Sequence, residues 1–142
     1  MTTPSPQDEH TVVSIGVVRS PLTCPEDAPR QGDEGAPDAW LEMATSVVPG
    51  LSGLSAGDEL IILTWLHRAD RGTLEVHPRG NLDRPLTGVF ATRSPDRPNP
   101  IGLHRVNLLD IQENRLHVEP LEAIDGTPIL DIKPVLGRSD ER

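Results

Sequence analysis

The sequence predicts an all-β fold, a small single-domain barrel or sandwich of about seven or eight short strands. Two observations lead to this class. Fifteen prolines and twelve glycines in 142 residues are typical of a strand-and-turn protein rather than a helical bundle. Short apolar or alternating runs recur between turn signals, and no stretch carries a long helical period. Because the only aromatic residues are Trp40, Trp65 and Phe90, the core is expected to consist mainly of Leu, Ile and Val.

In the first half of the chain three strands are expected. The β-branched run 12–19 predicts the first. Residues 24–38 are too rich in Pro, Gly and acidic residues to pack, so they predict a long loop that is either functional or loosely ordered. Residues 40–48 fit a second strand, and residues 50–57 a turn or a single helical turn. Residues 59–67 are the most hydrophobic and predict a central strand buried on both faces.

The second half continues the pattern of short strands and turns. Residues 74–77 alternate and predict a strand, and residues 88–91 are apolar and predict a buried one. Alternating residues over 103–121 predict a hairpin. The Asp-Gly-Thr-Pro sequence at 125–128 is a strong turn signal before a final alternating strand over 129–135.

These elements predict one domain over residues 11–137, with polar tails at 1–10 and 138–142. Cys24 is the only cysteine, which excludes an intrachain disulfide and fits a reducing compartment. No apolar run reaches the ~18 residues needed to span a bilayer. A cytoplasmic location without a membrane partner is therefore expected.

The charge is unevenly distributed. The net charge is −9, but residues 68–105 carry seven arginines and four acidic residues, so this segment is +3 and the remainder −12. The arginines are Arg68, Arg71, Arg79, Arg84, Arg93, Arg97 and Arg105. A basic segment in an acidic chain can bind phosphates, because affinity depends on the local field. Arginines spread over the surface and paired with nearby acids are the alternative.

The segment 88–102 reads GVFATRSPDRPNPIG and contains three prolines within six residues. Each proline fixes its own φ and disfavours helix in the residue before it, so the segment predicts a stiff loop of preset shape. Its Arg, Ser, Asp and Asn side chains either surround a ligand or face water in an ordinary connector.

The common catalytic motifs are missing from the sequence. The histidines are far apart, none at the i, i+4 spacing of a helical metal site, so no metal is expected. The sequence has no G-x-S-x-G motif, P-loop or dinucleotide fingerprint.

Two carboxylates and one histidine could take part in chemistry. Asp125 opens a turn, where Asp often accepts backbone N–H bonds, and Asp131 can pair with Lys133 on the same strand face. A partly buried carboxylate can also accept a proton or favour a nearby cation. His67 ends the hydrophobic strand, where it is either structural or functional. The residues alone leave these alternatives open.

Several blocks together are more specific than any single motif. The runs GVFATRSPDRPNPIG and DGTPILDIKP, with SIGVVRSP, PRQG, GLSGL and the strand ending in WLH, resemble the TsaA-like (TrmO) family over about residues 13–135. The resemblance implies a small β-barrel and a homodimeric methyltransferase that uses S-adenosylmethionine. It implies a tRNA partner, methylated on the exocyclic amine of threonylcarbamoyl-adenosine, the base 3′ of the anticodon.

The resemblance also implies which residues form the site. Those expected to bind the cofactor are Gln31, Gly32, Asp33, Leu66, His67, Thr92, Arg93, Gly102, Pro120 and Leu121. The amine is a weak nucleophile because its lone pair is delocalised, so a carboxylate that takes its proton would help. Asp125 or Asp131 is expected in this catalytic role. Arg93, Arg97 and Lys133 are expected to bind RNA phosphates or the threonyl carboxylate.

The sequence departs from the family pattern at two positions. Val135 stands where the family has tyrosine, and Asp96 where asparagine is common. Longer bacterial members also carry a second, C-terminal domain. With the acidic net charge, these departures leave a second function open: a cofactor-binding or partner-binding module of the same fold without tRNA methylation.

Overall fold

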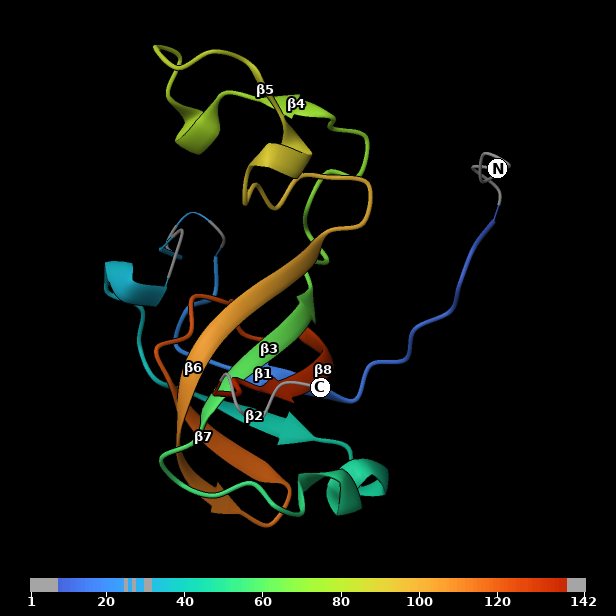
Figure 1. Cartoon of the computed structure of the whole chain (residues 1–142), viewed down its shortest axis with the longest axis vertical. Helices are drawn as coiled ribbons and strands as arrows, with labels where there is room; N and C mark the ends of the chain where they lie inside the picture. Colours follow the sequence, from blue (N-terminus) through green and yellow to red (C-terminus); the bar gives the residue numbers. More distant parts are fainter. Residues whose placement is uncertain (1–7, 25, 27, 30–31, 138–142) are drawn as a thin grey trace.

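The computed structural model describes residues 8–24, 26, 28–29 and 32–137, and it confirms the all-β class. Six strands close into an antiparallel barrel in the order β1-β2-β7-β6-β3-β8 (Figure 1). Their bounds are β1 Gly16–Arg19, β2 Ala39–Met43, β3 Glu59–Trp65, β6 Ile101–Gln112, β7 Arg115–Glu119 and β8 Pro128–Pro134. The predicted barrel is therefore present, and the alternative of a sandwich is excluded.

The barrel core follows the alternation of its strands. On β3, Leu60 and Ile62 point inward and are fully buried, whereas the residues between them are half-buried. On β6, Val106 and Leu108 point inward and are 1% exposed. The core is aliphatic, as the composition predicts. Residues 59–67 were expected to be buried on both faces of the strand. Only the side chains on the inner face are fully buried.

A small lobe over residues 66–100 stands above the barrel, at the end of β3 and the start of β6 (Figure 1). It contains a two-stranded sheet of β4 (Glu75–Val76) and β5 (Thr87–Gly88). Two 3₁₀ turns, η4 (Pro78–Gly80) and η5 (Val89–Ala91), complete it. Val89 is buried, but Leu82 and Phe90 are 79% and 81% exposed. The lobe thus has little apolar core of its own.

The predicted hairpin and final strand are confirmed, with β6 and β7 joined by a tight turn at Glu113, whose φ is 57°. The strand predicted over 88–91 is wrong. Its partner β4 has two residues, so pairing ends at Gly88 and the chain turns into η5.

Four other predicted strands are shorter than expected. The strand over 59–67 ends at Trp65, and the strand over 74–77 is reduced to Glu75–Val76. The strand over 12–19 begins at Gly16, because Val12 and Val13 are 62% and 73% exposed and pair with no strand. The strand over 40–48 ends at Met43, which pairs with the first residue of β1. The 3₁₀ helix η3 (Thr45–Leu51) follows it.

The described residues contain neither a membrane-spanning helix nor a cluster of metal ligands. No helix among them is long and apolar enough to cross a membrane. None of their His, Cys, Asp and Glu side chains form a group of three that could hold a metal ion. The predicted tail 138–142 and most of the tail 1–10 lie outside the described residues.

Candidate functional site

Two of the expected cofactor-binding residues meet where β3 ends and β6 begins. Gly102 pairs with Thr64 across the two strands, and the Leu66 N–H donates to the Pro100 carbonyl at 2.8 Å. Gly102 packs so tightly that a Cβ built on it would lie 3.1 Å from Leu66 Cδ2. Leu66 and Gly102 are therefore neighbours at the end of the barrel below the lobe.

Two other expected segments are η2 (Gly32–Glu34), which precedes β2, and residues 120–121, which follow β7. The 3₁₀ turn η2, which contains Asp33, packs against β6. The loop after it is tied to the 120–121 segment, because the Leu121 N–H donates to the Pro37 carbonyl at 2.9 Å. Pro120 follows a cis peptide bond, and Leu121 is fully buried. Gln31 lies outside the described residues.

The lobe is joined to this region by an ion pair. Arg79 of η4 lies 2.6 Å from Glu34 of η2. His67, which was expected beside the cofactor, is exposed in the turn after β3. The structure thus places η2 between the barrel and the lobe, and Leu66 at the junction of the two.

The loop after η5 is held by arginines. The Arg97 guanidinium donates to three backbone carbonyls, those of Ser94 at 2.7 Å, Val89 at 2.9 Å and Thr92 at 2.6 Å. Arg71 donates to the Pro98 carbonyl at 2.7 Å and lies over the Trp65 ring, 5.1 Å from its centroid. The predicted stiffness therefore comes from cationic clamps as well as from prolines. RNA binding by Arg97 stays a prediction, since its Nε and Nη2 donors already bind backbone carbonyls.

The side chain of Thr92 takes part in the same loop, accepting the Ser94 N–H and donating to the Val89 carbonyl. Arg93, between Thr92 and Ser94, is exposed and has no hydrogen-bond or ion-pair partner among the described residues. The loop therefore leaves Arg93 free to bind a ligand.

Asp125 lies in the turn that joins the 120–124 segment to β8. Its carboxylate accepts the Ser20 N–H at 3.0 Å, and its own N–H donates to the Leu22 carbonyl at 2.6 Å. These bonds hold the end of β1 against the turn, which is the structural role that an Asp in a turn commonly has.

Asp131 and Lys133 lie on the outer surface of β8, where they pair at 3.7 Å as expected. Asp131 pairs with Leu63 of β3. Leu63 points outward because its neighbours Ile62 and Thr64 point inward, so Asp131 points outward as well. Neither side chain is brought together with Leu66 and Gly102. Their assigned roles in catalysis and RNA binding stay predictions without support from the geometry.

A buried polar network of Thr64, His104 and Glu122 lies beside Gly102, and no sequence motif predicted it. Thr64 Oγ1 is 2.7 Å from His104 Nε2, and His104 Nδ1 is 2.5 Å from Glu122 Oε1. Thr64 is fully buried, and His104 is 5% exposed. The sequence signal that could have found it is the alternation of β6, which turns His104 inward with Val106 and Leu108.

Asp38, at the end of the long loop, is bonded to the barrel. Its carboxylate lies 2.6 Å from His117 Nε2 on β7, and the His117 ring stacks on Trp40 at 4.6 Å. The hydrogen bond from His117 and one from the Asp38 backbone lower the pKa of this carboxyl group. The contact holds the loop that carries Asp33 and Pro37 against the barrel.

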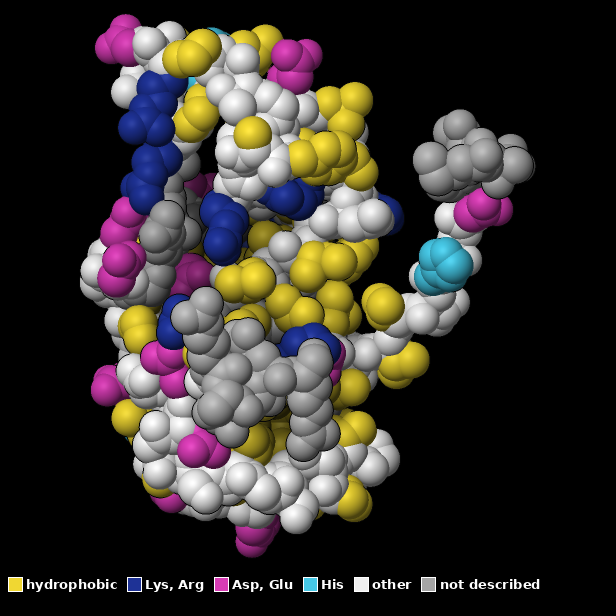
Figure 2. All heavy atoms as spheres, viewed as in Figure 1, with side chains coloured by type: hydrophobic (Ala, Val, Ile, Leu, Met, Phe, Trp, Pro, Cys, Tyr) yellow, Lys and Arg dark blue, Asp and Glu magenta, His cyan; other side chains and the backbone are white. Residues whose placement is uncertain are grey.

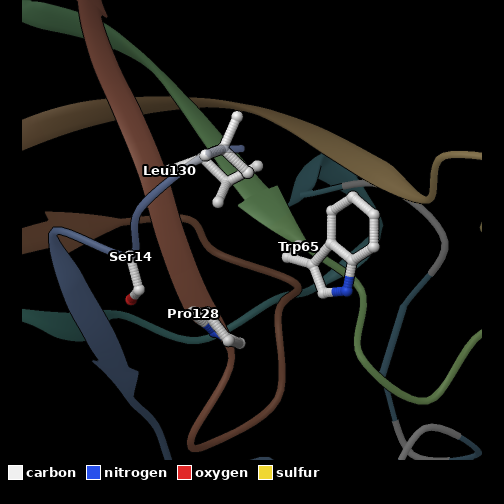
Figure 3. A pocket seen from close by; sticks show the side chains of 5 residues that line it. Ser14, Trp65, Pro128 and Leu130 are labelled. Carbon is white, nitrogen blue, oxygen red and sulfur yellow. The ribbon is translucent and has the colours of Figure 1, made fainter. Parts of the chain in front are cut away.

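A hollow of about 250 Å³ lies away from these residues, on the outer face of β3 and β8 (Figure 3). It is lined by Val12, Ser14, Trp65, Pro128 and Leu130. Its lining is mostly apolar and contains no ionisable group, so it does not fit a charged ligand.

Together these features define a small β-barrel with a candidate ligand site in the loops at one end of the barrel. The tRNA-methyltransferase O N-terminal domain (TrmO_N) family matches residues 17–141, and the chain belongs to this family.

The relatives and solved structures agree. A probable S-adenosyl-L-methionine-binding protein of Methanothermobacter thermautotrophicus is 43% identical over 120 residues, which are 84% of this chain and 85% of the relative. An S-adenosyl-L-methionine-binding protein of Archaeoglobus fulgidus is 43% identical over 119 residues, 84% of each chain.

A crystal structure of TrmO is 35% identical with a TM-score of 0.75 and covers 94% of this chain. A crystal structure of TrmO from Pseudomonas aeruginosa is 32% identical, has a TM-score of 0.72 and covers 95% of this chain. This chain spans about 60% of the length of those two solved chains. The expected family and fold are confirmed, and the expected cofactor, S-adenosylmethionine, is confirmed at the level of the family.

Replacing Gly102 with alanine should disrupt the junction of β3 and β6. The new Cβ would lie 2.4 Å from Thr64 Oγ1 and 2.8 Å from His104 Nε2, so the buried polar network must shift. We expect a loss of about 1–3 kcal/mol in the free energy of unfolding, measured by denaturant titration. The control is Gly88→Ala, where nothing lies within 4 Å of the new Cβ. Equal stability of both variants would contradict the packing described here.

Arg97 and Arg93 should differ in their effect on stability, although they lie in one loop. Arg97→Ala removes a charged donor from three carbonyls, and we expect it to lower the free energy of unfolding by about 1–3 kcal/mol. It should also speed amide exchange in residues 89–97. Arg93→Ala should change stability by less than about 0.5 kcal/mol. Unchanged exchange in the Arg97 variant would refute the clamp.

Proposed function

We propose that the chain is an S-adenosylmethionine-dependent methyltransferase acting on the exocyclic amine of threonylcarbamoyl-adenosine beside the tRNA anticodon. The observation that carries this proposal is the TrmO_N match over residues 17–141, which includes every expected site residue from Gln31 to Leu121. A tRNA substrate agrees with a reaction in the cytoplasm.

The residues at the end of the barrel fit the cofactor. S-adenosylmethionine combines a sulfonium cation with ribose hydroxyls and a flat base, and when bound it supplies an activated methyl group. Asp33 offers a carboxylate to the cation or the hydroxyls, and Leu66 offers an apolar surface. Gly102 keeps the backbone free of a side chain beside Leu66.

The main task of the protein in such a transfer is alignment, because an in-line displacement needs its reacting atoms in one geometry. The clamps from Arg97 and Arg71 restrict the loop over residues 92–100. The ion pair between Arg79 and Glu34 restricts η2 relative to the lobe. These contacts hold the segments on both sides of the site before a ligand binds.

The arginines of the basic segment divide into two groups. The side chains of Arg71, Arg79, Arg97 and Arg105 bind protein groups, whereas those of Arg68, Arg84 and Arg93 are exposed and have no polar partner in the described part of the chain. Figure 2 shows Lys and Arg side chains gathered where the lobe meets the barrel. The three exposed arginines belong to the lobe and suit RNA phosphates, although the rest of the chain is acidic.

A binding module without tRNA methylation is the second candidate. The net charge of −9 opposes RNA binding, and Val135 cannot stack on a base as the family tyrosine could. The relatives from Methanothermobacter and Archaeoglobus are named for cofactor binding rather than for methyl transfer.

A homodimer fits the outer apolar face, which we define as Leu63, Trp65, Ile101, Leu103 and Leu130. Trp65 pairs with Ile101 and Leu63 with Leu103, so these side chains are neighbours on the outside of the barrel. Ile101 and Leu103 are 47% and 46% exposed. The hollow beside Trp65 adjoins this face (Figure 3), and a second copy of the chain would cover both.

The substrate assignment predicts methyl transfer that depends on the modified base. With labelled S-adenosylmethionine, we expect label to enter tRNA from cells that lack this gene, but not tRNA from wild-type cells, whose sites are already methylated. Transcribed tRNA without the threonylcarbamoyl group should stay unlabelled, and labelling of it would overturn the substrate. Cofactor binding by calorimetry without transfer to any tRNA would support the binding module, and no binding would exclude both functions.

The dimer assignment predicts that a charge on the outer apolar face separates the copies. Leu103→Glu should shift the sedimentation coefficient from that of a dimer to that of a monomer, because a carboxylate would be buried in an apolar interface. Leu82→Glu in the lobe is the matched control, since Leu82 is 79% exposed and lies outside this face. A wild-type chain that sediments as a monomer at all concentrations would contradict the assignment.

A further inference from the structure

The buried polar network reaches from the barrel core to its rim. Exposure rises along it, from 0% at Thr64 and 5% at His104 to 14% for the Glu122 side chain. Its members come from β3, from β6 and from the segment after β7. The network therefore connects three elements of the candidate site and ends at a carboxylate that solvent can reach.

The hydrogen bonds define how the neutral imidazole carries its proton. A carboxylate only accepts, so His104 Nδ1–H donates to Glu122 Oε1 over 2.5 Å. Nε2 then accepts from the Thr64 hydroxyl over 2.7 Å. This order of hydroxyl, imidazole and carboxylate is the one that moves protons in many enzymes. Thr64 itself is fully buried, so it is not the group that meets a substrate.

Glu122 has one oxygen left. Oε1 takes the bond from His104, and Oε2 has no partner among the described residues. Glu122 directly follows Leu121, and the rest of the network, Thr64 Oγ1 and His104 Nε2, lies beside Gly102. The free oxygen therefore belongs to the same end of the barrel as the expected cofactor site.

The two carboxylates expected as catalysts are otherwise engaged. Asp125 accepts the Ser20 N–H, and Asp131 pairs with Lys133 on the outer surface of β8. Glu122 differs from both because it is held by an imidazole and is next to Leu121. The turn η2, which packs against β6, carries Asp33 and Glu34, and Glu34 pairs with Arg79.

We propose that Glu122 is the proton acceptor of the methyl transfer, with His104 and Thr64 as its positioning residues. The proposal rests on the proposed function. As the amine nitrogen bonds to the methyl carbon, the carbon–sulfur bond breaks and its electron pair stays on sulfur. The nitrogen then loses one proton, which passes to Glu122 and on to solvent. His104 holds the carboxylate in place by donating its Nδ1–H to Oε1, while Oε2 takes the proton.

The first test is Glu122→Gln, which keeps the size of the side chain but cannot accept the proton. Single-turnover transfer to modified tRNA should fall by about 100-fold or more, the range expected for a general base. Binding of S-adenosylmethionine, measured by calorimetry, should stay within about threefold of the wild type, too small a change to account for that loss. The control is Glu119→Gln, an exposed carboxylate three residues earlier, which should transfer at the wild-type rate.

Chemical rescue separates proton transfer from a structural role. Glu122→Ala leaves space beside His104, and added formate should restore part of the lost transfer rate, whereas chloride at equal ionic strength should not. A carboxylate that only holds the fold would not be replaced by a diffusing anion. An inactive Glu122→Ala variant that formate does not restore would overturn the proposal.

A further readout needs neither cofactor nor RNA. In the free protein, nitrogen NMR of His104 should show a single tautomer with the proton on Nδ1, and Glu122→Gln should abolish this preference because an amide can donate as well as accept. Mixed tautomers in the wild type would contradict the positioning role.

The possible failures are distinguishable. If the wild type methylates tRNA and Glu122→Gln does so equally fast, the role of Glu122 is wrong and the proposed function stands. If the wild type methylates no tRNA, the proposed function fails, and the role of Glu122 fails with it.

Discussion

The register between β3 and β6 is the interaction on which the rest of the structure depends. Each residue of β3 from Glu59 to Trp65 has a partner on β6, from Asn107 back to Ile101. This pairing turns Thr64 and His104 into the barrel and leaves Leu103 on the outside. Side chains alternate with period two, so a shift of one residue would exchange the two faces. The buried polar network and the outer apolar face are therefore two consequences of one register.

The lobe is stabilised by different interactions from the barrel. It buries Val89, but leaves Leu82 and Phe90 exposed, so apolar burial contributes little to its stability. Hydrogen bonds from arginine to backbone carbonyls take its place, and such bonds are stronger than those between neutral groups. The same residues that make the segment basic in the sequence are therefore partly consumed in holding its shape. The net charge of residues 68–105 therefore overstates the positive charge that is available to an RNA phosphate.

The sequence predicted what depends on local pattern and missed what depends on distant contacts. The alternation of β6, β7 and β8 was sufficient for the hairpin and the last strand. Strand lengths at residues 12–19, 40–48 and 88–91 were wrong, because they depend on how far each partner strand extends. The resemblance identified the family and its cofactor. It could not identify the buried polar network, whose members are 40 and 18 residues apart and form no motif.

The division of the arginines bears on how a short acidic chain could hold RNA. Three exposed arginines contribute a limited number of phosphate contacts, and each contact adds to both affinity and salt dependence. Two copies joined through the outer apolar face would bring two lobes to one RNA, because Ile101 and Leu103 begin the strand that leaves the lobe. Linked contacts of this kind strengthen binding without any new residue. The apolar face beside β3 and the basic junction above it would then serve one substrate, which is why dimer formation and RNA affinity should be lost together.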